Sequence, residues 1–182
     1  MTSLKDIQGN YTIDSAHSNL GFVARHAMIT KVRGNFAEFE GTASGNGSAP
    51  ADAKVNVTAK AASIYTGNEM RDKHLRSGDF FDVEKFPEVK FASTKIDVIG
   101  DDTLNITGDL TIRDQTRSIT IPFEFGGEMT DASGNSRIGF EGSTTISRKD
   151  FGLTWNAALE AGGVMVSDKI TLEIEISAVK QN

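Results

Sequence analysis

The sequence contains no cysteine among its 182 residues. This absence excludes a disulfide framework, a thiolate metal site and a cysteine nucleophile. No apolar run approaches the ~18 residues that a membrane-spanning helix needs. Residues 1–20 also lack the apolar stretch of a secretory signal. We therefore expect a cytoplasmic protein.

Positive charge is also in short supply. Nineteen basic residues face 25 acidic ones, which gives a net charge of −6. A basic surface for nucleic acid is not expected from this balance, so we predict no nucleic-acid partner. Stable membrane insertion is not predicted either, because no apolar run is long enough. The length and the 38% of hydrophobic residues suit a single domain over residues 1–182.

Aromatic hydroxyl and indole groups are scarce, because 11 of the aromatic residues are Phe, two are Tyr and one is Trp. Such a set indicates an interior with little need for polar partners.

The chain alternates between apolar and polar residues almost from end to end, which predicts an all-β protein. Ile170, Leu172, Ile174 and Ile176 show the pattern most clearly. The half-polar strands favour antiparallel pairing. Other strands are predicted at residues 20–26, 55–61, 89–98, 104–112, 119–125 and 138–146, in a long strand that begins at Val32, and in a short one at 11–13.

Two local features interrupt the alternation. The apolar register changes within residues 89–98, which predicts a β-bulge near Ser93 to Lys95. Residues 68–76 are rich in helix formers and predict a short helical insert.

Eight long strands and a helical insert favour a closed or nearly closed antiparallel barrel over a β-sandwich. The inward rows combine Phe and Ile with small residues. Either the small residues leave room for an elongated apolar ligand, or they accommodate strand coiling and barrel taper. They are Ala24, Gly34, Ala59, Ala61, Gly108, Gly142 and Thr144.

Few polar residues are arranged for chemistry. Asp14, His17 and Ser18 lie close in sequence, but we interpret them as a turn, with His17 bonded to backbone, rather than as a hydrolytic triad. His17, His26 and His74 lack metal-ligand spacing, so no metal site is predicted.

Several motifs together resemble the YceI-like family. They occur in the family order and cover residues 11–178. They are YTIDSAHS at 11–18 followed by Phe22 and His26, VRGNF at 32–36, RDKHLRSGDFFDV at 71–83, FP at 86–87, FAST at 91–94, GDLTI at 108–112 and SRKDFG at 147–152. Asp114 departs from the pattern, because the family has Gly in this turn; Asp tolerates the left-handed conformation that the turn requires.

The resemblance implies a lipocalin-like, extended eight-stranded barrel that binds a polyprenyl phosphate or an isoprenoid quinone as carrier or reservoir. It also implies no enzymatic activity, no required cofactor and a homodimer. We predict that His26, Arg25 and Arg33 meet the head group of the lipid. The residues predicted to contact its tail are Phe22, Phe36, Phe91, Leu110, Phe123, Phe140 and Trp155.

Two other functions stay open on the sequence alone. One is a hydrolase or isomerase that acts on an apolar substrate held in the barrel. The other is a structural dimer whose barrel is filled by its own side chains.

Overall fold

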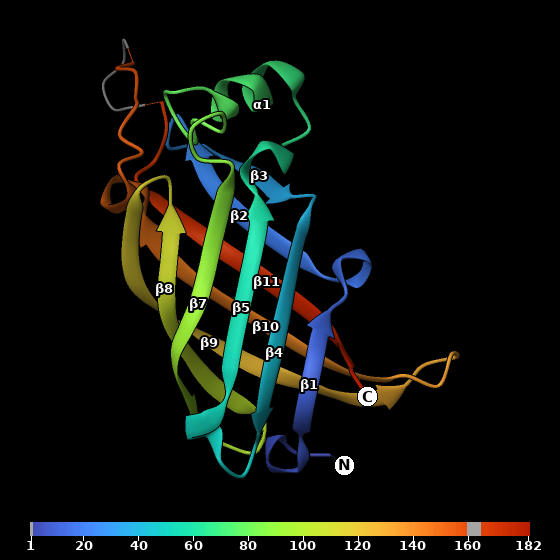
Figure 1. Cartoon of the computed structure of the whole chain (residues 1–182). Coiled ribbons are helices and arrows are strands. Elements are labelled where there is room, and N and C mark those ends of the chain that lie inside the picture. The colour runs from blue at the N-terminus through green and yellow to red at the C-terminus, as the bar shows by residue number, and fades with distance from the viewer. Residues whose placement is uncertain (1, 160–164) are drawn as a thin grey trace.

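The computed structural model describes residues 2–159 and 165–182. Eight antiparallel strands form a closed ring, because β1 pairs with both β4 and β11. Figure 1 shows this barrel with α1 above one end and the chain termini toward the other. In ring order the strands are β1 (Gln8–Ile13), β4 (Phe39–Asn46), β5 (Lys54–Lys60), β7 (Glu88–Val98), β8 (Thr103–Ile112), β9 (Gln115–Thr130), β10 (Ser136–Ser147) and β11 (Lys169–Lys180).

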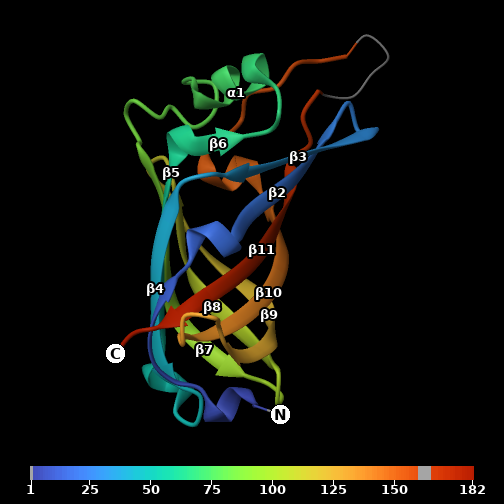
Figure 2. The ribbon, with the colours of Figure 1, turned by 90° about the vertical axis from the view of Figure 1, so that its right-hand side faces the viewer.

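Three further strands extend the sheet outside the ring. The strand β2 (Asn19–His26) pairs with β11, β3 (Thr30–Phe36) pairs with β2, and β6 (Ile64–Tyr65) pairs with β3. Both β1 and β2 pair with β11, β1 near the end of that strand and β2 nearer its start. In Figure 2 the β2–β3 hairpin leaves the barrel at the α1 end.

The predicted antiparallel barrel, the helical insert and the bulge between Ser93 and Lys95 are confirmed. The eight long strands expected from the sequence do not all lie in the ring, because β2 and β3 pair outside it. The long strand predicted from Val32 is split, so that β3 ends at Phe36 and β4 begins at Phe39. The strand β4 had no hydrophobic alternation to reveal it, because its inward positions after Phe39 are Gly and Ala.

The α1 end of the barrel is covered by α1 (Glu69–Arg76) and the turns after it. The Asn68 side chain caps the helix by accepting a hydrogen bond from the Arg71 amide at 3.0 Å. The buried Asp72 carboxylate accepts from the amide and the hydroxyl of Thr66, while Arg71 donates to the Thr66 hydroxyl and carbonyl. These contacts tie the helix to the end of β6.

The described residues also form short 3₁₀ helices. One of them, η1 (Leu4–Asp6), precedes β1, and the others lie between strands: η2 (Ser15–His17), η3 (Pro50–Asp52), η4 (Ala61–Ser63) and η5 (Arg148–Phe151). The turn from β8 to β9 forms with Asp114 in place, but the left-handed residue there is Arg113, at φ 57°. The expected left-handed position is therefore one residue too late. No described helix is both long and apolar enough to cross a membrane.

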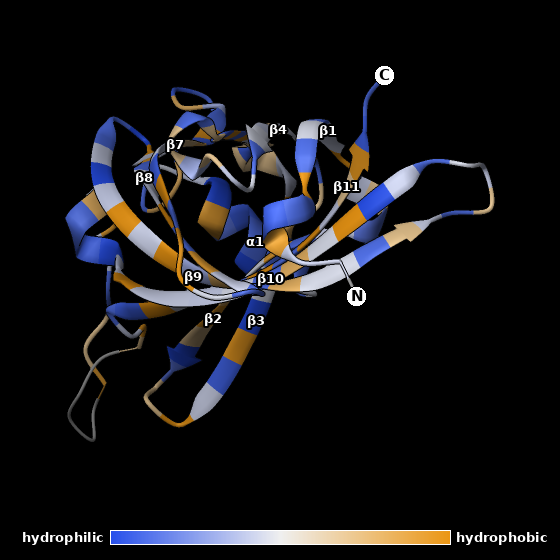
Figure 3. Cartoon of the chain, turned by 90° about the horizontal axis from the view of Figure 1, so that it is seen from below, coloured by the Kyte–Doolittle hydropathy of each residue, from blue (hydrophilic) through white to orange (hydrophobic). Residues whose placement is uncertain are grey.

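Hydrophobic and hydrophilic residues alternate along the barrel strands, as the end-on view in Figure 3 shows for β9. The apolar residues point inward and form two buried clusters. One lies around Ile106 and Phe123, and the other, nearer α1, around Leu110 and Phe151.

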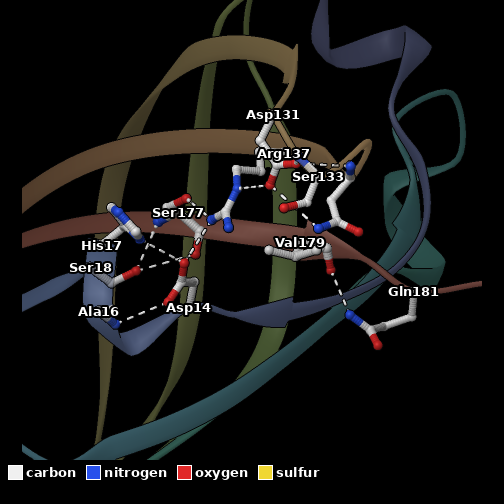
Figure 4. A network of polar contacts seen from close by, with 11 residues as sticks. Asp14, Ala16, His17, Ser18, Asp131, Ser133, Arg137, Ser177, Val179 and Gln181 are labelled. Carbon is white, nitrogen blue, oxygen red and sulfur yellow. Dashed lines mark hydrogen bonds and ion pairs between the residues drawn. The ribbon is translucent and has the colours of Figure 1, made fainter.

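An ion-pair clamp joins the β9–β10 turn to the place where β1 ends. The Arg137 guanidinium lies 2.7 Å from Asp14 through Nη1 and 2.7 Å from Asp131 through Nε (Figure 4). Hydrogen bonds from this guanidinium hold the pKa of each carboxyl down at about 2. The clamp therefore fixes the point at which the chain leaves the ring for β2.

Because of the clamp, we expect the free energy of unfolding to depend on pH. Both carboxyls have a lowered pKa when folded, so their stabilising effect is complete above the unfolded value of 3.8 and is lost as the pH falls toward 2. We expect Arg137→Gln to be less stable than the wild type at neutral pH and to lose much of its pH dependence between about pH 4 and 2.

Thermal unfolding at a series of pH values measures both effects. Arg117→Gln is the matched control, because Arg117 is exposed on β9 and its hydrogen bonds go to a carbonyl and an amide oxygen. A constant difference between Arg137→Gln and the wild type from neutral pH down to pH 2 would contradict the assignment.

Candidate functional site

A cavity of about 360 Å³ occupies the interior of the barrel. Leu4, Ile7 and Pro50 line it at the end with the termini, and Leu75 and Phe80 line it at the α1 end. Its wall is almost entirely apolar. Such a space suits an apolar molecule, because water inside it would find few hydrogen-bond partners. The cavity also argues against a barrel filled by its own side chains.

All eight ring strands contribute to the cavity wall. Seven residues were predicted to contact the tail, and all of them except Trp155 line the cavity. The six are Phe22, Phe36, Phe91, Leu110, Phe123 and Phe140. Their position in the cavity follows from the period-two alternation, and their contact with a ligand stays a prediction.

Phenylalanine rings lie against glycines of neighbouring strands. A Cβ atom added at Gly34 would lie 2.5 Å from Cζ of Phe22, its cross-strand partner. The same distance separates a Cβ at Gly142 from Phe123, and one at Gly108 from Phe91. The space over these glycines is therefore filled by rings, and the rings themselves line the cavity.

Phe22, Phe36 and Phe81 continue this aromatic wall toward α1. The Phe22 and Phe36 ring centroids are 6.1 Å apart, and Phe36 meets Phe81 edge-on at 5.7 Å. These are favourable aromatic geometries. They join β2 and β3 to the turn that follows α1, so that the extension outside the ring still helps to form the cavity.

Trp155 lies one layer outside the cavity wall. Its ring centroid lies 4.6 Å from that of His74, edge-on, and 5.5 Å from that of Phe80. His74 Nε2 is also hydrogen-bonded to the Asp79 carboxylate at 2.8 Å. Phe80 lines the cavity and Trp155 does not. Trp155 packs against the segment that covers the α1 end, and its contact with the tail stays a prediction.

The three residues predicted for the head group also lie outside the cavity wall. Arg25, His26 and Arg33 are exposed. Arg25 and Arg33 lie on the face of the hairpin opposite Phe22, while His26 lies near the hairpin tip, where it bridges Val166. Their role as head-group ligands stays a prediction.

Arg148 lines the cavity, and the sequence reasoning did not single it out. It begins η5 and is only 4% exposed. Its Nε donates to the Ser167 carbonyl at 2.9 Å, Nη1 to the Leu153 carbonyl at 2.6 Å and Nη2 to the Val166 carbonyl at 3.4 Å. Burial lowers its pKa, and the charge of Asp168 opposes that shift.

Arg148 makes no ion pair within the described part of the chain. Three of the five N–H donors of a guanidinium are engaged by carbonyls, which leaves two for another acceptor. A buried cation without a carboxylate partner is costly unless an acceptor is supplied. The signal available in the sequence was the motif Ser147-Arg148, at the end of an inward-alternating strand.

Asp14, His17 and Ser18 form a turn, as expected, and not a triad. Asp14 accepts from the Ala16 amide, and the His17 ring bonds to the Asp14 carboxylate at 2.8 Å instead of to backbone. The Ser18 hydroxyl bonds to the backbone of Ser177 in both directions. Among the described residues, no three His, Asp or Glu side chains are grouped to hold a metal ion.

A closed antiparallel barrel with an apolar cavity is an architecture that can enclose a hydrophobic ligand. The chain belongs to the YceI-like domain family, which matches residues 11–178.

Relatives and solved structures agree with this membership. A UPF0312 protein of Pseudomonas putida is 35% identical over 173 residues, which are 94% of this chain and 86% of the relative. A UPF0312 protein of Staphylococcus aureus is 36% identical over 90% of this chain and 94% of its own length. The Campylobacter jejuni YCEI protein superposes with a TM-score of 0.74 at 33% identity, over 87% of this chain and 90% of its own.

A more distant structure shares the fold. A polyisoprenoid binding domain from Saccharophagus degradans superposes with a TM-score of 0.69 at 14% identity, over 94% of this chain and 98% of its own.

Because Phe22 lies against Gly34, we expect substitutions at these two positions to have non-additive effects on stability. In Gly34→Ala the three atoms nearest the new methyl group belong to the side chains of Phe22 and Thr66, so we expect the ring to be displaced at a cost of about 1–3 kcal/mol. Phe22→Leu removes the ring. The double variant should therefore be more stable than the sum of the two single changes predicts.

Chemical denaturation of the four proteins measures the coupling. Gly139→Ala is the matched control within a strand, because a Cβ there would lie 3.8 Å from the nearest atom. Strict additivity of Gly34→Ala and Phe22→Leu would show that the ring and the glycine do not constrain each other.

Proposed function

We propose that this protein binds a long-chain isoprenoid lipid, of the polyprenyl phosphate or isoprenoid quinone type, inside its barrel. It acts as a carrier or reservoir and not as an enzyme. The observation that supports this most directly is the apolar cavity, which extends from Leu4 at one end of the barrel to Phe80 at the other. The cytoplasmic location and the homodimer expected from the sequence stay predictions.

The tail of such a lipid supplies most of the binding free energy. Burial of each CH₂ group contributes about 0.8 kcal/mol, whereas a hydrogen bond to a charged group contributes about 1.5–3 kcal/mol. A few isoprene units therefore outweigh any head-group contact, even after the cost of ordering the chain. Affinity then follows chain length more than head-group chemistry.

Arg148 supports a defined orientation of the lipid. It is the buried cation of the cavity wall, it lies near the α1 end, and its hydrogen bonds go to carbonyls. A phosphate oxygen or a quinone carbonyl would accept its remaining donors. We propose that the head group lies at the α1 end and that the tail extends toward Leu4.

Organic extraction of the purified protein, followed by mass spectrometry, tests the proposal. We expect a long-chain lipid near one per barrel. In uptake assays from detergent, polyprenyl phosphates should bind more tightly as the chain lengthens, and about tenfold more tightly than the alcohol of equal length, because Arg148 meets a charged acceptor. A clean extract together with no uptake of any polyprenyl compound would refute the proposal.

A pair of substitutions on β5 tests whether the lipid occupies the cavity. Val57 lines it, and the adjacent Thr58 does not. Val57→Phe should reduce uptake of long chains by about tenfold or more and that of short chains much less, because the added ring fills the lumen. Thr58→Phe adds the same ring on the outer face and should leave uptake unchanged. Equal effects of the two variants would place the lipid elsewhere.

A further inference from the structure

The tip of the β2–β3 hairpin exposes two large hydrophobic residues. Met28 is 65% exposed and Ile29 is 78% exposed. The hairpin projects away from the barrel at the α1 end, as Figures 2 and 3 show from two directions. The tip is therefore accessible and lies at the same end as Arg148.

The turn at this tip has an unusual sequence for its backbone. Ala27 and Met28 both have a left-handed conformation, at φ 51° and 61°, and the Ile29 amide donates to the His26 carbonyl at 3.0 Å. A β-turn with two left-handed central residues strongly favours Asn-Gly at those positions. The left-handed conformation of Met28 is energetically unfavourable, and its exposed side chain gains no burial in return. This combination indicates a role other than stabilising the fold.

One face of the same hairpin is cationic. Arg25 lies directly opposite Lys31, and Arg33 follows on the same face opposite Val23. All three cations are exposed, and within the described part of the chain none of them forms an ion pair. Residues 15–37 contain no Asp or Glu, although the whole chain carries a net charge of −6. Like charges in directly opposed positions weaken a hairpin, so folding alone does not explain them.

Two other exposed apolar residues, Ile99 and Met129, lie among carboxylates instead. Ile99 is 65% exposed and Met129 is 62% exposed, each at or near a hairpin end. Their sequence neighbours include Asp97, Asp101 and Asp102 for Ile99, and Glu128 and Asp131 for Met129. The combination of an apolar tip with surrounding positive charge therefore distinguishes the β2–β3 hairpin from these two.

We propose that the β2–β3 hairpin docks the protein on anionic phospholipid bilayers. Met28 and Ile29 enter the interface between head groups and acyl chains, while Arg25, Lys31 and Arg33 contact lipid phosphates. Apolar insertion combined with basic residues is the chemistry that recognises such surfaces. The docking is peripheral, and it does not depend on which ligand the barrel holds.

The opposite face of the hairpin connects this surface to the cavity. Phe22 and Ala24 line the cavity, and they alternate along β2 with Val23 and Arg25 on the cationic face. Docking through the tip therefore brings the α1 end of the lumen close to the bilayer.

Co-sedimentation with vesicles tests the proposal. One set of vesicles is phosphatidylcholine alone, and the other contains about one third phosphatidylglycerol. We expect binding to the anionic vesicles, with strong weakening at high salt because the charges are exposed. Lys31→Gln should lower the partition coefficient about fivefold, and Ile29→Ser about tenfold or more.

Matched controls carry the same substitutions elsewhere. Lys54→Gln removes an exposed charge from the start of β5, and Ile99→Ser removes an exposed isoleucine from an acidic turn. Neither should change vesicle binding. Unfolding temperatures show that the variants fold, and Lys31→Gln should not be destabilised, since it relieves repulsion from Arg25.

Several results would overturn docking: no binding to anionic vesicles, equal effects of Lys31→Gln and Lys54→Gln, or retention on nucleic acid without vesicle binding. Lipid uptake from detergent is measured separately on the same proteins, so failure of docking and failure of the lipid-binding proposal are distinguishable.

Discussion

The fit of phenylalanine rings against glycines of neighbouring strands is the constraint on which the cavity depends. An eight-stranded barrel is narrow enough for its own side chains to fill it. Here Phe22, Phe91 and Phe123 each lie over a glycine, where even a methyl group would approach a ring to 2.5 Å. The rings cover the strands at their thinnest points and leave the axis of the barrel open. The same residues therefore stabilise the wall through burial and keep apolar surface available for a ligand.

The cavity wall has very few polar groups, and the buried one, Arg148, lies near the α1 end, so the two ends of the cavity differ. Arg148 is held by three backbone carbonyls, which satisfy hydrogen bonds without neutralising the charge. A carboxylate partner at this point would have cancelled the attraction for an anionic or polarised head group. By contrast, Arg137, at the other polar centre of the molecule, is saturated by Asp14 and Asp131 and has a structural role. The two guanidiniums therefore differ in their partners, which are carbonyls for Arg148 and carboxylates for Arg137.

The sequence predicted what depends on alternation and failed where burial is decided by tertiary contacts. Period two located most strands, the bulge at Ser93 to Lys95 and the inward position of six tail residues. It could not show that β1 and β2 both pair with β11, nor that β2 and β3 lie outside the ring. The strand β4 carries small inward residues and gave almost no signal. The positions of Trp155 and Arg148 were not evident from the sequence, because the segments around them do not alternate and their contacts with α1 and Ser167 are long-range.

The placement of β2 and β3 outside the closed ring lets one hairpin face both the cavity and the exterior. A barrel strand within the ring has one face in the lumen and its ends fixed by both neighbours. The β2–β3 hairpin keeps the lumen face, through Phe22 and Phe36, but its tip extends past the ring. One pair of strands can therefore present apolar residues to the cavity and cations to the exterior simply by alternation. Because β6 pairs with β3 and α1 follows β6 in the chain, the cover of the lumen is attached to the same hairpin. A contact made at the hairpin tip thus acts on the structural unit that closes the α1 end of the barrel.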